Sequence, residues 1–234
     1  MKNFSKSAKT YIISIILVGF GLGVGLFRGL DLGNPGLYLL AILAAGAQIL
    51  KLEGPNDRTN YNIASFVFGF TLITLGSPAT LLVILVAHLA EWAWHKYPWF
   101  IQSFNLTAYA IVVTLSNLVF QTIKAGSNLN SLDGALAIAA ALLIFVLSNH
   151  LLVGWVIKLA RGQSFKESGV FSFMTLVLDF TVLGMGASTA LIWFYNHFAS
   201  LLNVVPLYLL YNALRVPALR RQVEIVKTQK SPAI

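Results

Sequence analysis

Long apolar runs cover the chain from Tyr11 to Leu214 and are interrupted only by short polar or Gly/Pro breaks. A helix needs about 20 mainly apolar residues to cross a lipid bilayer. Dividing the chain at its breaks gives eight candidate segments, near residues 11–30, 36–50, 61–76, 78–95, 105–123, 132–158, 169–195 and 199–214. The pattern therefore predicts an all-α integral membrane protein with about eight transmembrane helices.

The third and fourth predicted helices are separated only by Gly76, Ser77 and Pro78. Each is short for a hydrocarbon core of about 30 Å at 1.5 Å of rise per residue. They either cross the membrane fully or form a re-entrant hairpin. The chain returns to its starting side in both cases, so the orientation of the remaining helices is the same.

The distribution of lysine and arginine indicates the orientation. An even number of crossings places both termini on one side, and of 16 Lys and Arg only Arg28 and Lys124 then fall on the other side. Membrane proteins keep an excess of Lys and Arg in their short cytoplasmic loops. We therefore predict that both termini are cytoplasmic.

The predicted helices leave no room for a separate soluble domain, so we expect a polytopic membrane domain over 1–214 and a basic amphipathic cytoplasmic tail over 215–234. Apolar residues of the tail recur at the 3-4-3 spacing of a coiled-coil seam: Val216, Leu219, Val223 and Val226. The tail is interpreted as an interfacial helix on anionic lipid headgroups, or as the start of a signalling helix.

Composition narrows the class of function. The chain is 57% hydrophobic and 10% charged, against roughly a quarter charged in soluble domains. The net charge of +8 lies mostly beside the predicted helices, where it sets topology, so we expect no nucleic-acid partner. The absence of cysteine excludes disulfides and thiolate metal sites, and no H-E-x-x-H, G-x-S-x-G or P-loop motif occurs. We predict no catalytic residue, no cofactor and no enzyme activity.

Asp179 is the one acidic residue well inside a predicted span. A carboxylate there must face protein or water and find a partner, or be protonated, and His150 in the preceding span is a plausible partner. With Asn105 and Asn149, these residues outline a partly polar interior. We predict a ligand-binding site formed by Asp179, His150, Asn149 and Asn105. The alternative for each is a helix-to-helix hydrogen bond.

The stretch HLAEWAWHKYPWF places His88, Glu91 and His95 on one helix face, which is one arrangement of metal ligands. Nothing in the sequence shows that further ligands converge there, so we predict no metal site. The favoured interpretation is an interfacial helix exit formed by Glu91, His95, Lys96 and Trp99. In it the aromatic side chains lie at headgroup level and Glu91 pairs locally with His95.

Three stretches carry a family resemblance: Asn62 to Phe120, then SNHLLVGWVIKLARGQSFKES, then LLYNALRVPALRRQVE. Residues 60–224 resemble the multi-span N-terminal sensor regions of bacterial diguanylate cyclases and HD-type phosphodiesterases. The resemblance lies in the order of short spans, the G-S-P turn, the K-x-P-W exit and the final L-x3-R helix. The resemblance implies a sensor of a ligand or membrane state in the bacterial cytoplasmic (inner) membrane. No output enzyme follows in this sequence, so we expect signal transduction through a separate protein.

The leading hypothesis is thus a non-enzymatic membrane sensor-type or scaffolding subunit whose partners are membrane lipids and another protein. A first alternative is the substrate-binding membrane subunit of a small-molecule transporter of the energy-coupling-factor type. A second is an accessory subunit of a respiratory or photosynthetic membrane complex. The short spans and Gly/Pro turns favour the first alternative, whereas small size and 12% aromatic residues favour the second.

Overall fold

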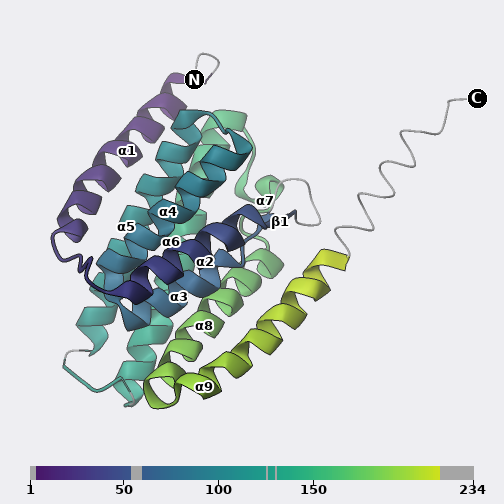
Figure 1. Ribbon diagram of the computed structural model, residues 1–234. Helices are drawn as coiled ribbons and strands as arrows, with labels where there is room; N and C mark the ends of the chain where they lie inside the picture. Colours follow the sequence, from purple (N-terminus) through teal and green to yellow (C-terminus); the bar gives the residue numbers. More distant parts are fainter. Residues whose placement is uncertain (1–3, 54–59, 125, 130, 217–234) are drawn as a thin grey trace, which may run out of the picture.

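The computed structural model describes residues 4–53, 60–124, 126–129 and 131–216. The regular structure of this part of the chain consists of helices and one two-residue antiparallel strand pair, β1 (Leu52–Glu53) with β2 (Asn60–Tyr61). The helical elements, seen in Figure 1, are α1 (Lys6–Phe27), α2 (Pro35–Ile49), α3 (Ala64–Thr74), α4 (Gly76–His95), α5 (Trp99–Lys124), α6 (Leu132–Arg161), α7 (Phe165–Ser168), α8 (Phe173–Tyr195), α9 (His197–Ser200) and the 3-10 turn η1 (Leu201–Asn203).

Six of the described helical segments are long and apolar enough to cross a membrane: α1, α4, α5, α6, α8 and the segment His197–Val216. The prediction of an all-helical membrane protein agrees with this. A helix lies in each of the eight predicted places, but α2 has 15 residues and α3 only 11. They rise roughly 22 and 16 Å, less than the hydrocarbon core of about 30 Å. The count of eight crossings is therefore not confirmed.

The prediction that the third and fourth helices are the short pair is wrong for the fourth. The helix α4 has 20 residues, and the short helices are α2 and α3. The helix α4 begins at Gly76 and so includes the G-S-P stretch. Pro78 is tolerated because it lies in the first turn, where a missing backbone N–H removes no intrahelical hydrogen bond. The break falls instead at Gly76, whose φ of +78° favours glycine.

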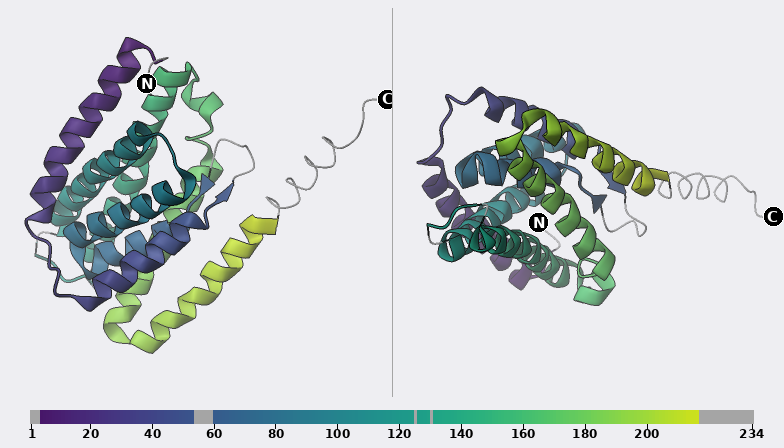
Figure 2. Two further views of the ribbon diagram at one scale, coloured as in Figure 1. Left: turned by 45° about the horizontal axis from the view of Figure 1, so that its top comes forward. Right: turned by 90° about the horizontal axis from the view of Figure 1, so that it is seen from below.

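The long helices form a bundle around one apolar core (Figures 1 and 2). In it α5 packs against α1, α4 and α6, α2 packs on α4, and α3 packs on α8. The Ser5 hydroxyl donates to the Leu159 carbonyl at 3.2 Å, and the Phe4 and Phe100 rings meet edge to face. The start of α1, the start of α5 and the end of α6 therefore share one end of the bundle. The side of the membrane that this end faces stays a prediction.

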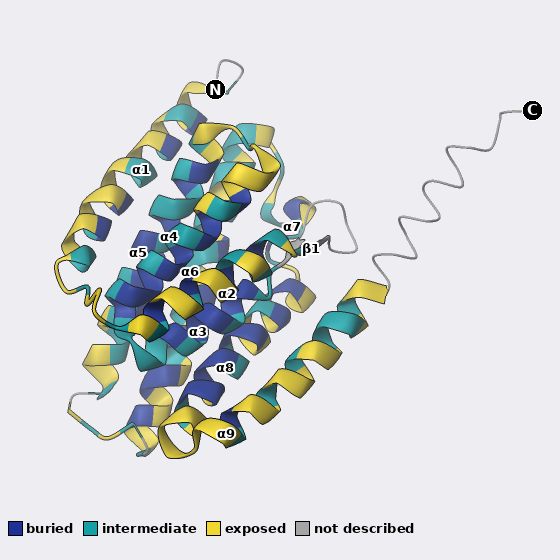
Figure 3. Cartoon of the chain, viewed as in Figure 1, coloured by how far each residue is buried: buried dark blue, intermediate teal, exposed yellow. Residues whose placement is uncertain are grey.

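The segment from His197 to Val216 leaves the bundle. It meets α8 at α9 and diverges from it in both Figure 1 and Figure 2. Most of its side chains are exposed, as Figure 3 shows, whereas buried residues gather where α3, α4, α5, α6 and α8 meet. The predicted tail beyond residue 216 lies outside the described residues.

Glycines set the closest contact between helices. A Cβ on Gly69 of α3 would overlap the Leu183 carbonyl oxygen of α8, and a Cβ on Gly186 of α8 would overlap the Phe66 carbonyl oxygen of α3. At each glycine the backbone of the other helix occupies the space that a Cβ would fill. Small residues allow this close approach in membrane-helix interfaces. This reciprocal contact fixes α3 against α8.

We predict that Gly186→Ala destabilises the protein because the added methyl forces α3 and α8 apart. Overpacking of this kind costs roughly 1–3 kcal/mol. The measurement is the midpoint of thermal unfolding in detergent micelles, which should fall.

The matched control is Gly184→Ala on the same helix, where a Cβ meets nothing within 4 Å. Because alanine favours a helix over glycine by about 1 kcal/mol, this variant should be as stable as the native protein or more so. Equal midpoints for the two alanine variants would contradict the packing argument.

Candidate functional site

A cavity of about 250 Å³, partly open to the outside, lies between α4, α5, α6 and α8. The end of α2 and the start of α3 close one side of it. Most of the side chains around it are polar, although the helices that carry them are apolar. The lining residues are Gln48, Lys51, Asn62, Ser65, His88, Glu91, Asn105, Ala108, Tyr109, Phe145, Val146, Asn149, His150, Val153, Asp179 and Leu183. At about 30 Å³ per water molecule, the volume corresponds to roughly eight waters or one small polar molecule.

Glu91 of α4 is the centre of one polar cluster in the cavity wall. Its side chain is only 5% exposed, and the Lys51 ammonium donates to Oε1 at 2.5 Å. The Gln48 amide donates to Oε2 at 2.9 Å, and His88 Nδ1 lies 3.1 Å from the same oxygen. Both carboxylate oxygens are therefore bound by groups from α2, the segment after α2, and α4 itself.

Lys51 lies between α2 and β1, outside the six long apolar helices. Besides Glu91, its ammonium binds the Tyr97 hydroxyl at 2.9 Å. Burial by itself lowers the pKa of Lys51, but the hydrogen bonds to Glu91 and Tyr97 outweigh burial and raise this pKa above its ordinary value. The side chain is therefore a cation held by a carboxylate.

Further contacts fix the orientation of this cluster. The Asn62 amide donates to Gln48 Oε1 at 2.6 Å, and the Gln102 amide of α5 donates to the His88 carbonyl. His88 Nε2 and Gln102 Oε1 are buried and have no hydrogen-bond partner among the described residues. Gln102 thereby bridges α5 to α4 beside the cavity.

His150 and Asp179 form a second pair, between α6 and α8. His150 Nε2 lies 2.8 Å from Asp179 Oδ2, and His150 Nδ1 lies 2.7 Å from the Val170 carbonyl oxygen just before α8. The imidazole is nearly buried, whereas the Asp179 side chain is 26% exposed. One ring nitrogen of His150 thus contacts a backbone carbonyl, and the other contacts the Asp179 carboxylate beside the cavity.

Asn105 of α5, Tyr109 of α5 and Asn149 of α6 supply polar groups that are not committed elsewhere. All three line the cavity, and their side chains make no hydrogen bond within the described part of the chain. The Tyr109 ring packs against the rings of His88 and Phe145, with centroids 5.1 and 5.9 Å away. Two amides and a phenol are therefore placed to bind a molecule in the cavity.

The four residues predicted to bind a ligand, Asp179, His150, Asn149 and Asn105, all line this one cavity. The pairing of His150 with Asp179 also agrees with the structure. That pair makes the helix-to-helix contact named as the alternative, and Asp179 nevertheless remains partly exposed. Their role in binding a ligand stays a prediction.

The predicted local pair between Glu91 and His95 is wrong. Glu91 points inward and is held by Lys51, Gln48 and His88, whereas the exposed His95 is the last residue of α4 and stacks on Tyr97 at 5.5 Å. The end of α2 packs against α4 at the level of Glu91, so a cation reaches the carboxylate there.

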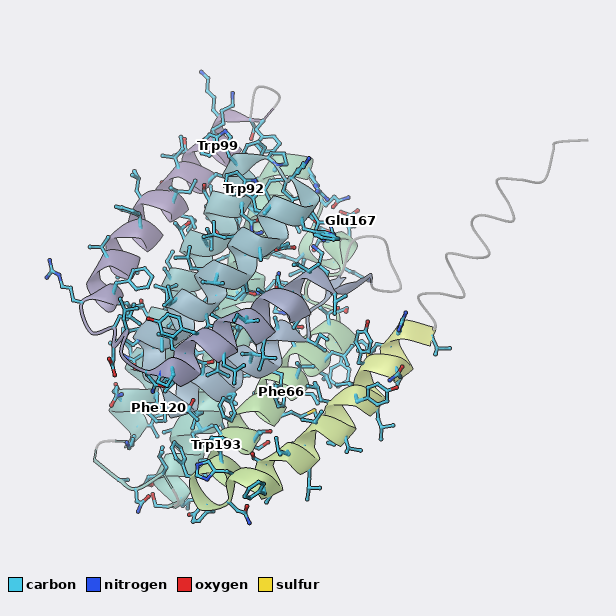
Figure 4. All side chains as sticks on the ribbon, viewed as in Figure 1. Phe66, Trp92, Trp99, Phe120, Glu167 and Trp193 are labelled. Atoms are coloured by element: carbon cyan, nitrogen blue, oxygen red, sulfur yellow. The ribbon has the colours of Figure 1, made fainter. Side chains whose placement is uncertain are left out.

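The other residues of the predicted helix exit lie where α4 ends. Lys96 adopts the left-handed conformation that stops α4, and Trp99 begins α5 with its side chain largely exposed. Trp92 and Trp99 lie toward the end of the bundle where α1 begins, as does Glu167 of α7, and Trp193 lies toward the opposite end (Figure 4). Aromatic side chains near both ends of a bundle are typical of membrane proteins.

Sequence reasoning missed Gln48, Lys51, Asn62 and Tyr109. The count of Lys and Arg on the two sides of the membrane treats Lys51 as a loop cation, because the second predicted helix is counted as a full crossing. The available signal is a polar residue, Gln48, near the end of an apolar run and followed three residues later by Lys51. Within the described residues, no three His, Asp or Glu side chains are grouped so as to hold a metal ion.

Comparisons of the chain with protein-family models, curated proteins and solved structures find no match. The function proposed below therefore rests on the geometry of the cavity.

We predict that Glu91→Gln strongly destabilises the protein, because it leaves the Lys51 ammonium without its carboxylate. Breaking a buried pair in this way costs about 3–5 kcal/mol. The midpoint of thermal unfolding in detergent should fall accordingly. The matched control is Asp133→Asn, an exposed carboxylate at the start of α6, which should change the midpoint little.

The double variant Lys51→Met, Glu91→Gln should recover part of the lost stability, since it removes both charges. A double variant as unstable as the sum of the two single variants would show that the two side chains do not act as a pair.

Proposed function

We propose that this protein is a membrane-embedded binding protein that holds a small polar molecule in the cavity between α4, α5, α6 and α8. The observation that carries the proposal is the convergence of Asp179, His150, Asn149 and Asn105 on one cavity of about 250 Å³. The three helices that carry them bring together polar groups from distant parts of the sequence. Binding sites in helix bundles are commonly built in this way.

The energetic cost of the cavity supports a role in binding. Polar groups in a membrane bundle are expensive unless paired, and packing by apolar side chains would avoid that cost. Glu91, Lys51 and His150 are paired, but the side chains of Asn105 and Asn149 make no hydrogen bond to any described residue. Unpaired amides beside a cavity are placed to make their hydrogen bonds with a ligand or with water.

Two uses of such a site fit the sequence. In the leading one, occupancy of the cavity is the signal that a sensor-type or scaffolding subunit passes to a separate protein partner. In the alternative, the chain is the substrate-binding membrane subunit of a transporter. We favour the sensor because of the resemblance to bacterial sensor regions. The segment His197–Val216, which diverges from the bundle, offers an apolar helix for contact with a partner.

The proposal includes no catalytic step and places the protein in the bacterial cytoplasmic membrane. It is supported by the six long apolar helices and by the lack of a catalytic motif in the sequence. The cavity groups are pairs of opposite charge, amides and a phenol, which suit hydrogen bonding to a polar molecule.

The test is thermal unfolding of the purified full chain in lipid nanodiscs against a panel of small polar metabolites of each charge class. A ligand that binds only the folded state raises the free energy of unfolding, by about 2.7 kcal/mol at a concentration a hundred times its Kd. The unfolding midpoint rises with it. We expect at least one compound to do so. If no compound of the panel raises the unfolding midpoint, the proposal is overturned.

A bound compound should lose affinity in Asn149→Ala, because a hydrogen bond to the ligand is removed, with a loss of roughly fivefold to a hundredfold. Asn117→Ala on α5 is the matched control, since Asn117 lies outside the cavity. Equal losses in the two variants would place the compound elsewhere.

A further inference from the structure

The hydrogen bonds of His150 fix how many protons its pair with Asp179 carries. The Val170 carbonyl only accepts hydrogen bonds, so the proton of that 2.7 Å contact is on His150 Nδ1. The 2.8 Å contact between His150 Nε2 and Asp179 Oδ2 needs one further proton, on either atom. Whichever atom holds it, the pair carries one shared proton and no net charge.

In the rest of the cavity the permanent charges form a pair of opposite sign. Among the described lining side chains, the Lys51 cation is balanced by the Glu91 carboxylate at 2.5 Å. His88 directs Nδ1 at the Glu91 carboxylate, 3.1 Å away, and its buried Nε2 has no hydrogen-bond partner among the described residues. An added ligand charge would therefore be uncompensated among apolar helices, where isolated charges are costly.

The uncommitted groups distinguish between cationic and anionic ligands. The Lys51 ammonium is already bound to Glu91 and Tyr97, so an incoming carboxylate or phosphate finds no uncommitted Lys or Arg among the described lining residues. Both oxygens of Glu91 are bound, but within the described part of the chain Asp179 accepts only through Oδ2, which leaves Oδ1 without a partner there. Asn105 and Asn149, whose side chains each carry an acceptor oxygen, line the same cavity, as do Tyr109 and Phe145. Acceptor oxygens and aromatic faces are the groups that bind an ammonium ion.

We propose that the cavity binds a small organic ammonium ion in exchange for the proton shared by His150 and Asp179. The inference rests on the proposed function, since it names the class of ligand for the same cavity. The ammonium ion enters with one positive charge, and the shared proton leaves to water with one positive charge. Asp179 is then a full carboxylate facing the ligand, His150 keeps its proton on Nδ1, and the cavity stays neutral.

Other ionisable groups near the pair are accounted for. Those that line the cavity are Lys51 after α2, His88 and Glu91 on α4, and Tyr109 on α5. Lys51 and His88 both contact the Glu91 carboxylate, and Tyr109 is neutral as a phenol. On α7, which packs against α6, Lys166 and Glu167 are exposed to solvent. The exchangeable proton is therefore assigned to His150 and Asp179.

The experiment uses the full chain in lipid nanodiscs and probes in sets of three. Each set has an ammonium ion of four to ten non-hydrogen atoms, with an amide and a carboxylate of the same skeleton. One set is 2-phenylethylammonium, 3-phenylpropionamide and 3-phenylpropionate. Thermal unfolding ranks the probes, and titration calorimetry in two buffers of different ionisation enthalpy counts the protons released.

We expect an ammonium probe to stabilise the protein more than its amide and carboxylate partners. Its binding should release close to one proton. Affinity should then rise with pH, by up to about tenfold per pH unit while the pair holds its proton, because ligand and proton compete.

Variants locate the effect. Asp179→Asn should abolish proton release and reduce ammonium affinity at least tenfold, and Asp179→Glu should restore both in part. The matched control is Asp31→Asn, since Asp31 is exposed, lies outside the cavity and accepts from the Gly33 N–H, a contact that asparagine keeps. If Asp179→Asn does not fold, proton release by the native protein decides the question.

The outcomes separate the inference from the proposed function. Two outcomes would overturn the inference and leave the cavity as a binding site. In one, amide or carboxylate probes bind and ammonium probes do not; in the other, ammonium probes bind but release no proton. No binding by any probe of any charge, in these sets or in the metabolite panel, would overturn both.

Discussion

The contact between the Lys51 ammonium and the Glu91 carboxylate is the constraint on which the arrangement of the bundle depends. A carboxylate that is 5% exposed within an apolar helix is stable only if a cation and hydrogen-bond donors reach both of its oxygens. The donors come from α2, from the segment after α2 and from His88, so these parts of the chain must meet at one depth. The position of α2 against α4 follows from this requirement.

The short helices α2 and α3 make that meeting possible. Because α2 ends after 15 residues, Lys51 reaches the bundle interior instead of its surface. The return helix α3 is held against α8 by the reciprocal contact of Gly69 and Gly186, which places α8 and its Asp179 on the far wall of the same cavity. Close backbone packing and charge pairing thus act together to keep a polar space inside an apolar bundle.

The two charged pairs have different consequences. Glu91 has both oxygens bound and joins α2 to α4, so it serves stability. Asp179 is more exposed, and among the described residues only its Oδ2 has a partner, His150, whose orientation is fixed by the Val170 carbonyl. The proton that we propose the two side chains share lies in this contact. A pair of this kind can change its protonation when a charged ligand arrives, whereas the pair around Glu91 cannot do so without losing a structural contact.

The sequence by itself determined the all-helical membrane class and the places of the helices, because apolar runs must satisfy their backbone groups internally. It also singled out Asp179 with His150, since a carboxylate in a span needs a partner. Only the tertiary structure decided that Glu91 pairs with Lys51 and not with His95, and that Gln48, Asn62 and Tyr109 join the cavity. The physical reason is that hydropathy records how apolar a segment is, whereas the depth at which a short helix ends is set by its packing against α4 and α8.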